Sequence, residues 1–228
     1  MRGKIFDNAV NSDILELISL GGYAVVTDIL DQKFLQLLRN EFADLRNPED
    51  NRSRFHDESK STSWVNLDKI DPLWFPAFCN LVVSASSTMA ALTYDNEEMI
   101  LTKVYLVHST SESYRVGVLP FNPHFDRARY LKMMIYLDDV SLGSGPIYLK
   151  KKSPKDLEEK RRKIFFHENV PGLNVLQHDA DYKPVVGDAG TCIIFDTNCP
   201  HYGGQQSPGH ERRVIRLDFS AAAWNHRS

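Results

Sequence analysis

Short runs of strand-forming residues fill the second half of the sequence, and they limit the chain to few folds. From about residue 98, β-branched and aromatic residues gather in segments that are separated by glycine, proline and asparagine. The segments are MILTKVYLVHS, LKMMIYLDDV, IYLKKK, GTCIIFDT and RRVIRLDFSA. Short strands with turn residues between them are typical of β-sandwiches and β-barrels. We therefore expect an all-β core over residues 98–222.

The first 95 residues have another pattern, which predicts mainly helical support and the first strands. The segments NSDILELISLGG, DQKFLQLLRNEFADLRNP and PLWFPAFCNLVVSASSTMAAL each combine helix-starting residues with apolar residues at helical spacing. YAVVTDIL indicates a strand, and the polar segment NPEDNRSRFHDESKSTSW indicates a loop. Residues 151–183 form a charged insertion in the β pattern. Because no repeat or linker is visible, we expect a single domain over residues 1–228.

Charge and cysteine content exclude several classes of protein. The net charge is −3 and the pI is about 6.2, so nothing indicates a nucleic-acid or membrane partner. No apolar run approaches the roughly 20 residues of a membrane-spanning helix. Cys79, Cys192 and Cys199 form no CxxC pair, and their odd number argues against a disulfide framework. The segment MRGKIFDNAVNSD has no apolar stretch typical of a secretory signal, so we expect a cytoplasmic protein. The oligomeric state stays open.

A His-x-Asp pair, His124 and Asp126, precedes the apolar run LKMMIYL. In a strand, residues i and i+2 face the same side, so this imidazole and carboxylate can meet at one ion. A second histidine, His201, follows the segment GTCIIFDT, and Arg212 lies eleven residues later. Two imidazoles and one carboxylate on one face of an octahedral Fe(II) leave three positions open. A nearby guanidinium can hold the far carboxylate of a chelating dicarboxylate with two hydrogen bonds.

Four segments carry a resemblance to a known family: HFD, YLDDVSLGSGPIYL, GDAGTCIIFDTNCPHYGG and RRVIRLDF. In their order and spacing they resemble the phytanoyl-CoA dioxygenase (PhyH) family of Fe(II)/2-oxoglutarate-dependent oxygenases. The resemblance covers about residues 100 to 220 and, more weakly, the N-terminal helices. It implies a double-stranded β-helix, which is a cupin-like jelly roll, with helices packed on one side. It also implies a dioxygenase that consumes 2-oxoglutarate and O2 and releases succinate and CO2.

The resemblance also implies roles for single residues. His124, Asp126 and His201 match the iron ligands, and no further catalytic group is implied. Arg212 matches the anchor for the distal carboxylate of 2-oxoglutarate, with Arg213 as the alternative. If RRVIRLDF is one strand, Arg212 shares a face with the polar residues Arg216 and Asp218, whereas Arg213 shares the other face with apolar residues. Parity therefore favours Arg212 as the residue that faces a cavity.

Two departures from the family pattern leave the three ligand positions unchanged. LKKKSPKD stands where many members have a PGSH-like turn, and Gly203 stands where many have a small hydroxyl residue near 2-oxoglutarate. Asp126 distinguishes the chain from the halogenating relatives, which have a small residue there, so hydroxylation of a C–H bond of a small metabolite is expected. The alternatives are a non-catalytic jelly-roll protein that binds a metal or ligand, and an iron oxygenase that does not use 2-oxoglutarate.

Several polar residues near these motifs are candidates for further contacts. Lys103 and Tyr105 share one face of a predicted strand. One interpretation is that they contact 2-oxoglutarate or substrate, and the other is that they are simply exposed. Arg127, Arg129 and Arg216 are candidates for binding an anionic substrate, with surface ion pairing as the other interpretation for the first two.

Two further pairs of a histidine and an acidic residue lie outside the predicted strands. His56 and Glu58 form a second His-x-acid pair, but it lies in the predicted polar loop and is interpreted as surface. His178 and Asp179 lie in the insertion, which is either solvated or a lid over the site.

Overall fold

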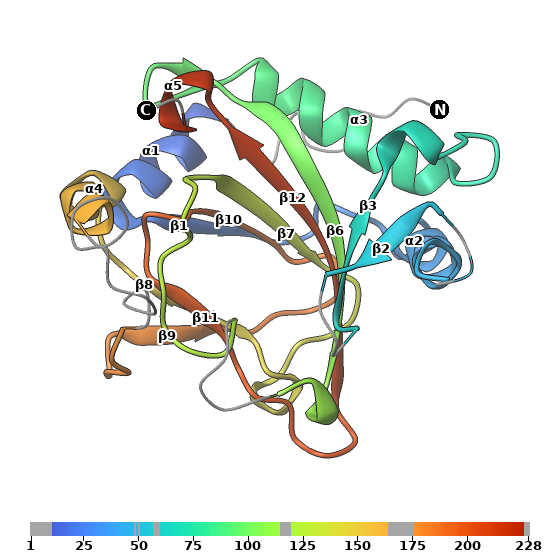
Figure 1. Ribbon diagram of the computed structural model, residues 1–228. Helices are drawn as coiled ribbons and strands as arrows, with labels where there is room; N and C mark the ends of the chain where they lie inside the picture. The colour runs from blue at the N-terminus through green and yellow to red at the C-terminus, as the bar shows by residue number, and fades with distance from the viewer. Residues whose placement is uncertain are drawn as a thin grey trace.

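Two facing antiparallel sheets form the centre of the computed structural model (Figure 1), which describes residues 11–225 except 48, 50, 57–59, 115–119 and 164–175. The larger sheet has the strand order β1-β10-β7-β12-β6-β3-β2, and the smaller has the order β11-β8-β9. The strands of the larger sheet are β1 (Tyr23–Val26), β2 (Ser53–Phe55), β3 (Thr62–Val65), β6 (Ile100–Thr110), β7 (Leu131–Tyr136), β10 (Cys192–Asp196) and β12 (Glu211–Ser220). The smaller sheet contains β8 (Ile147–Lys150), β9 (Tyr182–Val185) and β11 (His201–Gly203), and β4 (Thr93–Tyr94) pairs with β5 (Glu97–Glu98).

The described helices are α1 (Ser12–Gly21), α2 (Gln32–Leu45), α3 (Pro76–Ala90), α4 (Pro154–Arg162) and α5 (Ala222–Asn225). Polar side chains define where the first two begin. The side chain of Asn11 accepts a hydrogen bond from the backbone of Ile14, and that of Asp31 accepts one from Phe34. The buried carboxylate of Glu41 in α2 accepts the backbone N–H groups of Ala77 and Phe78, so α2 caps α3.

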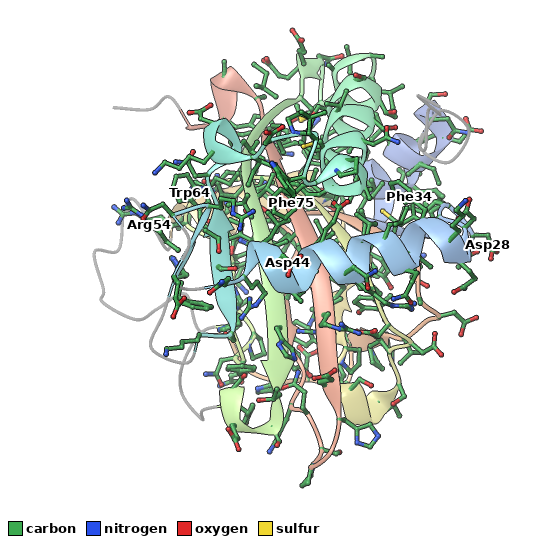
Figure 2. All side chains as sticks on the ribbon, turned by 90° about the vertical axis from the view of Figure 1, so that its right-hand side faces the viewer. Asp28, Phe34, Asp44, Arg54, Trp64 and Phe75 are labelled. Carbon is green, nitrogen blue, oxygen red and sulfur yellow. The ribbon has the colours of Figure 1, made fainter. Side chains whose placement is uncertain are left out.

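The alternating faces of the long strands separate two apolar cores. On β12, Ile215, Leu217 and Phe219 face the core that contains α1, α2 and α3. On the other face, Val214 packs with Tyr105, Met134 and residues of the smaller sheet, such as Ile147 and Leu149. Figure 2 looks onto the helical side and shows α2 crossing in front of the strands. The helices thus cover one face of the larger sheet and leave the other for the smaller sheet and the cavity.

The expected all-β core with flanking helices is confirmed. One expectation was wrong: the polar segment around residues 47–64 contains β2 and β3 rather than only a loop. The reason is tertiary, because β3 pairs with β6 and gains hydrogen bonds that its own sequence does not indicate. As a result, the first 95 residues contribute β1, β2 and β3 to the same sheet as the second half. Within the described residues, no helix has the length and apolar character needed to cross a membrane.

Candidate metal centre

His124, Asp126 and His201 come together in the lining of one cavity. His201 is the first residue of β11, and it pairs with His124 through two backbone hydrogen bonds, each 3.0 Å from N to O. This isolated bridge, rather than a regular strand, holds the His-x-Asp segment. The Nε2 atoms of both histidines lie 3.6 Å from Oδ1 of Asp126. The candidate ligand atoms of the three residues all lie within 4.8 Å of one another, which is a spacing that can hold one metal ion.

Backbone carbonyls set the tautomers of both imidazoles. Nδ1 of His124 lies 2.7 Å from the carbonyl oxygen of Asn122, and Nδ1 of His201 lies 2.9 Å from that of Cys199. A carbonyl oxygen can only accept, so each Nδ1 donates its proton in these contacts. The neutral rings then carry a lone pair on Nε2, the atom that faces Asp126. Hydrogen bonds from Nδ1 to backbone carbonyls orient metal-binding histidines in this way.

Electrostatics keep Asp126 and His201 in the protonation states that bind metal. Burial alone would raise the pKa of Asp126, but the ammonium of Lys132 and the two imidazoles hold it well below its usual value. Lys132 lies on β7, and its Nζ contacts Oδ2 of Asp126 directly. Burial, together with the neighbouring His124, lowers the pKa of His201 to about 4. The carboxylate is therefore ionised and the imidazole of His201 neutral at neutral pH.

Arg212 lies in the same cavity and is buried. Its Nη1 donates to the carbonyl oxygen of Gly145, and its guanidinium also bonds the hydroxyl of Tyr136. Its Nε atom is buried and has no hydrogen-bond partner among the described residues. Arg213 lies on the opposite face of β12, where its guanidinium holds Asp138 at 2.6 and 2.8 Å. An incompletely bonded buried guanidinium is a receptor for a carboxylate.

A cavity of about 470 Å³ joins these groups. Its described lining consists of His56, Thr62, Lys103, Tyr105, Val107, Pro120, His124, Asp126, Arg127, Ala128, Tyr130, Lys132, Met134, Ile147, Phe195, His201, Tyr202, Gly203, Arg212, Arg216 and Asp218. The volume is in the range of small-molecule sites. Among the residues that the sequence proposed for co-substrate or substrate contacts, Lys103, Tyr105, Arg127 and Arg216 lie in this lining.

Arg129 does not belong to the described cavity lining, which corrects its proposed place at a substrate. Its guanidinium is buried against three carboxylates, with the nearest contacts at 2.6 Å to Asp196, 2.8 Å to Asp95 and 3.1 Å to Glu158. It also lies 4.0 Å from the ring centre of Trp224. Arg127 and Arg129 are two residues apart and would share one face of a strand. The sequence alone therefore could not show that Arg129 is buried in ion pairs while Arg127 is exposed.

One charged residue of the site, Lys132, was not expected from the sequence. It lines the cavity and is buried, as is Asp218, which was expected on the cavity face of its strand. A signal for Lys132 was present, since it is the single charged residue in the apolar run LKMMIYL. Charged residues are rarely buried without a partner, so a lysine in such a run indicates a carboxylate opposite it.

None of the rival polar residues is grouped with the three candidate ligands. His56 lines the cavity and lies edge-on to Tyr105, at 6.3 Å between ring centres, but its sequence partner Glu58 falls outside the described residues. His178 lies edge-on against Tyr202, at 4.7 Å between ring centres, and Asp179 holds Lys150 in an ion pair. Part of the insertion that contains them, residues 164–175, is likewise not described.

Comparisons with known proteins agree with the motifs. A family model described as phytanoyl-CoA dioxygenase (PhyH) matches residues 19–214. A comparison with curated proteins gives no match.

Solved structures share the fold at low sequence identity. HygX from Streptomyces hygroscopicus is 16% identical over 94% of this chain and 88% of its own, with a TM-score of 0.63. The non-heme alpha-ketoglutarate-dependent epimerase SnoN is 15% identical over 92% of this chain and 82% of its own, with a TM-score of 0.60. AviO1 from Streptomyces viridochromogenes is 18% identical over 97% of this chain and 99% of its own, with a TM-score of 0.59. These similarities confirm the expected double-stranded β-helix fold.

Two of these proteins have been crystallised with their ligands. HygX has been solved with nickel, 2-oxoglutarate and hygromycin B, and separately with iron. SnoN has been solved with Fe3+, alpha-ketoglutarate and nogalamycin RO.

Proposed function

The chain belongs to the phytanoyl-CoA dioxygenase family, and we propose that it is an Fe(II)- and 2-oxoglutarate-dependent dioxygenase that hydroxylates an unactivated C–H bond of a small metabolite. The observation that carries this proposal is the grouping of His124, Asp126 and His201, whose candidate ligand atoms lie within 4.8 Å of one another. Two Nε2 lone pairs and one carboxylate oxygen are the donor set that suits non-haem Fe(II). Three ligands on one side of a bound ion would leave its other positions to the co-substrate and O2.

Arg212 is the proposed anchor of 2-oxoglutarate. Its Nε is buried and lacks a partner among the described residues, and burial lowers its pKa from the ordinary value. A carboxylate in the cavity would accept from this donor and compensate the buried positive charge. The residue two positions after His201 is Gly203, and a Cβ built on it would lie 3.7 Å from Nη2 of Arg212, so this position adjoins the guanidinium. The residues present therefore fit a dicarboxylate that reaches from the metal to the guanidinium.

Iron with 2-oxoglutarate and O2 supplies the oxidising chemistry, in which the co-substrate is converted to succinate and CO2. The protein's own residues orient and shield it. Nδ1 donation to carbonyls fixes both imidazole rings, and Lys132 holds one oxygen of Asp126. Met134, Ile147 and Phe195 give the cavity apolar walls that exclude water from a reactive site. In keeping with a reduced cytoplasmic setting, the three cysteines are free.

The identity of the product is a separate question from the identity of the co-substrate. SnoN, which shares the fold, is described as an epimerase. Hydroxylation is the outcome that we propose for this chain, because Asp126 stands where the halogenating relatives have a small residue. A non-catalytic metal-binding protein would need neither the open positions nor the buried Arg212. Product analysis after turnover separates hydroxylation from inversion at carbon.

Anaerobic titration of the metal-free protein with Fe(II) and 2-oxoglutarate tests the proposal. The chelate of Fe(II) with 2-oxoglutarate has a weak visible charge-transfer band, which we expect for the wild type. His124→Ala should abolish the band, and Arg212→Met should require far more 2-oxoglutarate to produce it. Arg213→Met is the matched control, since it removes the same type of side chain from the opposite face of β12. It should retain the wild-type titration curve.

Bound iron without the band in the wild type would contradict the use of 2-oxoglutarate and would favour the binding-protein alternative. If Arg212→Met and Arg213→Met weakened 2-oxoglutarate binding equally, the assignment of Arg212 as the anchor would be wrong. If the band behaves as expected, succinate release in air serves as the readout for a screen of substrates.

A further inference from the structure

The cavity carries more positive than negative charge. Among its described lining residues, the cationic side chains are Lys103, Arg127, Lys132, Arg212 and Arg216, whereas the carboxylates are Asp126 and Asp218. A concave site with apolar walls strengthens the field of such an imbalance and attracts ligands of opposite charge. A cation that already has a carboxylate partner is less available to a ligand, so the partners of the five cations determine which of them can bind one.

Two of the cations have carboxylate partners within the cavity. Lys132 contacts Oδ2 of Asp126, and Nε of Arg216 lies 2.9 Å from Oδ1 of Asp218. Arg212 is the proposed anchor of 2-oxoglutarate. The remaining cations are Lys103 and Arg127, and both side chains are exposed to solvent at the cavity.

Lys103 is held in place by aromatic groups rather than by a salt bridge. Its Nζ lies 3.3 Å from the hydroxyl of Tyr130 and 5.5 Å from the centre of that ring. Partial burial alone would lower the pKa of Lys103, but the neighbouring tyrosines and Asp218 raise it above the ordinary value. The guanidinium of Arg127 makes no ion pair with any described residue, and Arg127 follows the candidate ligand Asp126 directly. Neither cation forms an ion pair within hydrogen-bond distance among the described residues, so both present a positive charge to the cavity.

Strand register separates Lys103 from the end of the cavity that contains Arg212. Phe195, Lys132, Asp218 and Lys103 are register neighbours on the successive strands β10, β7, β12 and β6. Lys103 is thus two strands from Lys132, or about 10 Å at about 4.8 Å per strand, on the side away from β10. Arg212 is six residues from Asp218 along β12, which is about 20 Å at roughly 3.3 Å per residue. A co-substrate that reaches from the metal to Arg212 leaves Lys103 for another ligand.

We propose that the substrate is a small organic anion, with a carboxylate or phosphate group held between Lys103 and Arg127 while its reacting carbon faces the metal. This inference rests on the proposed function, because it assigns 2-oxoglutarate to Arg212. Lys103 lies on β6, and Arg127 directly follows the candidate ligand Asp126, so two segments far apart in the sequence each bring a cation to the lining of this cavity. Arg216, whose guanidinium carbon lies 4.1 Å from the ring centre of Tyr105, also lines this cavity.

Paramagnetic relaxation of probe protons by a bound metal tests whether small anions bind in the cavity in preference to neutral and cationic molecules. Mn(II) accepts oxygen and nitrogen ligands and replaces Fe(II) without turnover. With Mn(II) and saturating 2-oxoglutarate bound, the methyl protons of four probes are compared: acetate, methyl phosphate, acetamide and methylammonium. Acetate and methyl phosphate should relax several-fold faster than the neutral and cationic probes, and their ratio shows which anion is preferred.

Variants then assign the effect to the two side chains. An exposed ion pair contributes roughly 1 kcal/mol, so Lys103→Met and Arg127→Met should each weaken probe binding about fivefold. The matched control is Lys33→Met with Lys69→Met, which removes two exposed positive charges outside the cavity lining and should change nothing. Thermal unfolding midpoints verify that all variants are folded.

Equal relaxation of acetamide and acetate would overturn the anion proposal, as would an effect of the control variant equal to that of the cavity variants. Anion binding that persists in the Lys103→Met, Arg127→Met double variant would show that the probe binds the metal or Arg212 instead, and would also overturn it. The Fe(II)–2-oxoglutarate band, measured on the same preparation, distinguishes a failure of the proposed substrate class from a failure of the proposed function. If the band forms and anions are not preferred, only the substrate class fails; if the band does not form, the proposed function fails.

Discussion

Lys132 and Asp126 form an ion pair inside the cavity, so the two oxygens of this carboxylate have different surroundings. Oδ2 contacts the ammonium of Lys132, whereas Oδ1 lies 3.6 Å from Nε2 of each histidine. Lys132 is buried on β7 and also lies 5.9 Å from the ring centre of Phe195. The strand beneath the site therefore supplies the charge that balances the carboxylate before any metal is bound.

Replacing Lys132 by methionine should destabilise the metal-free protein at pH 7. The change leaves a largely desolvated carboxylate without its cation, which costs about 3 kcal/mol in similar buried pairs. Urea unfolding measures the loss. The double variant Lys132→Met, Asp126→Asn should recover much of it, because the amide carries no charge. An equal loss in the single and double variants would mean that packing, and not charge, is responsible.

The stability of the metal-free protein should fall as the pH drops from 6.5 to 4. The pKa of His201 is lowered to about 4 by burial and by His124, against about 6.5 in an unfolded chain. In this window the unfolded state binds a proton that the folded state excludes, so acid favours unfolding by roughly 2 to 3 kcal/mol at the lower end. Urea midpoints at pH 7, 5.5 and 4.5 give the slope. His201→Gln should flatten it, and an unchanged slope in that variant would assign the effect to other groups.

Arg129→Met should be strongly destabilising although Arg129 does not line the described cavity. It would leave Asp196, which is fully buried, without the guanidinium that lies 2.6 Å away. Removing one partner of a buried pair costs about 3 to 5 kcal/mol. Arg127→Met, two residues earlier and exposed, should change the free energy of unfolding by no more than about 0.5 kcal/mol. Similar losses for both variants would contradict the assignment of Arg129 to the buried network.

Gly203→Ser should strengthen 2-oxoglutarate binding. A Cβ at this position would lie 3.7 Å from Nη2 of Arg212 and 3.8 Å from the carbonyl oxygen of Pro120, which are ordinary contacts. The added hydroxyl would offer a carboxylate one more hydrogen bond, worth about 0.5 to 1.5 kcal/mol, or roughly 2- to 12-fold in affinity. The charge-transfer titration measures it.

Gly204→Ser is the matched control for that change. Its Cβ would lie 2.8 Å from the ring of Tyr148 and 2.9 Å from the carbonyl oxygen of Pro146, so this variant should lose stability instead. Unchanged 2-oxoglutarate affinity in a folded Gly203→Ser variant would show that the hydroxyl does not reach the co-substrate.

The charge network around Arg129 shows why part of the structure was not readable from the sequence. Arg127 and Arg129 have the same type and parity, and only the approach of Asp196, Asp95 and Glu158 from distant segments distinguishes them. The same holds for β3, whose polar sequence does not predict a strand until β6 offers its edge. In both cases the deciding partner lies far away in sequence.

Local chemistry by itself determined the strands of the core and the order of the site residues. Alternation along RRVIRLDF is enough to put Arg212 and Arg213 on opposite faces, because side chains of a strand alternate strictly. The His-x-Asp pair and His201 could be recognised because two imidazoles and a carboxylate suit Fe(II), and because their order and spacing resemble those of the phytanoyl-CoA dioxygenase family. Tertiary structure alone decided which charges compensate one another. Lys132 meets Asp126 and Arg129 meets Asp196 only after the segments pack, since ion pairing depends on distance and burial, and neither quantity is encoded at a single position.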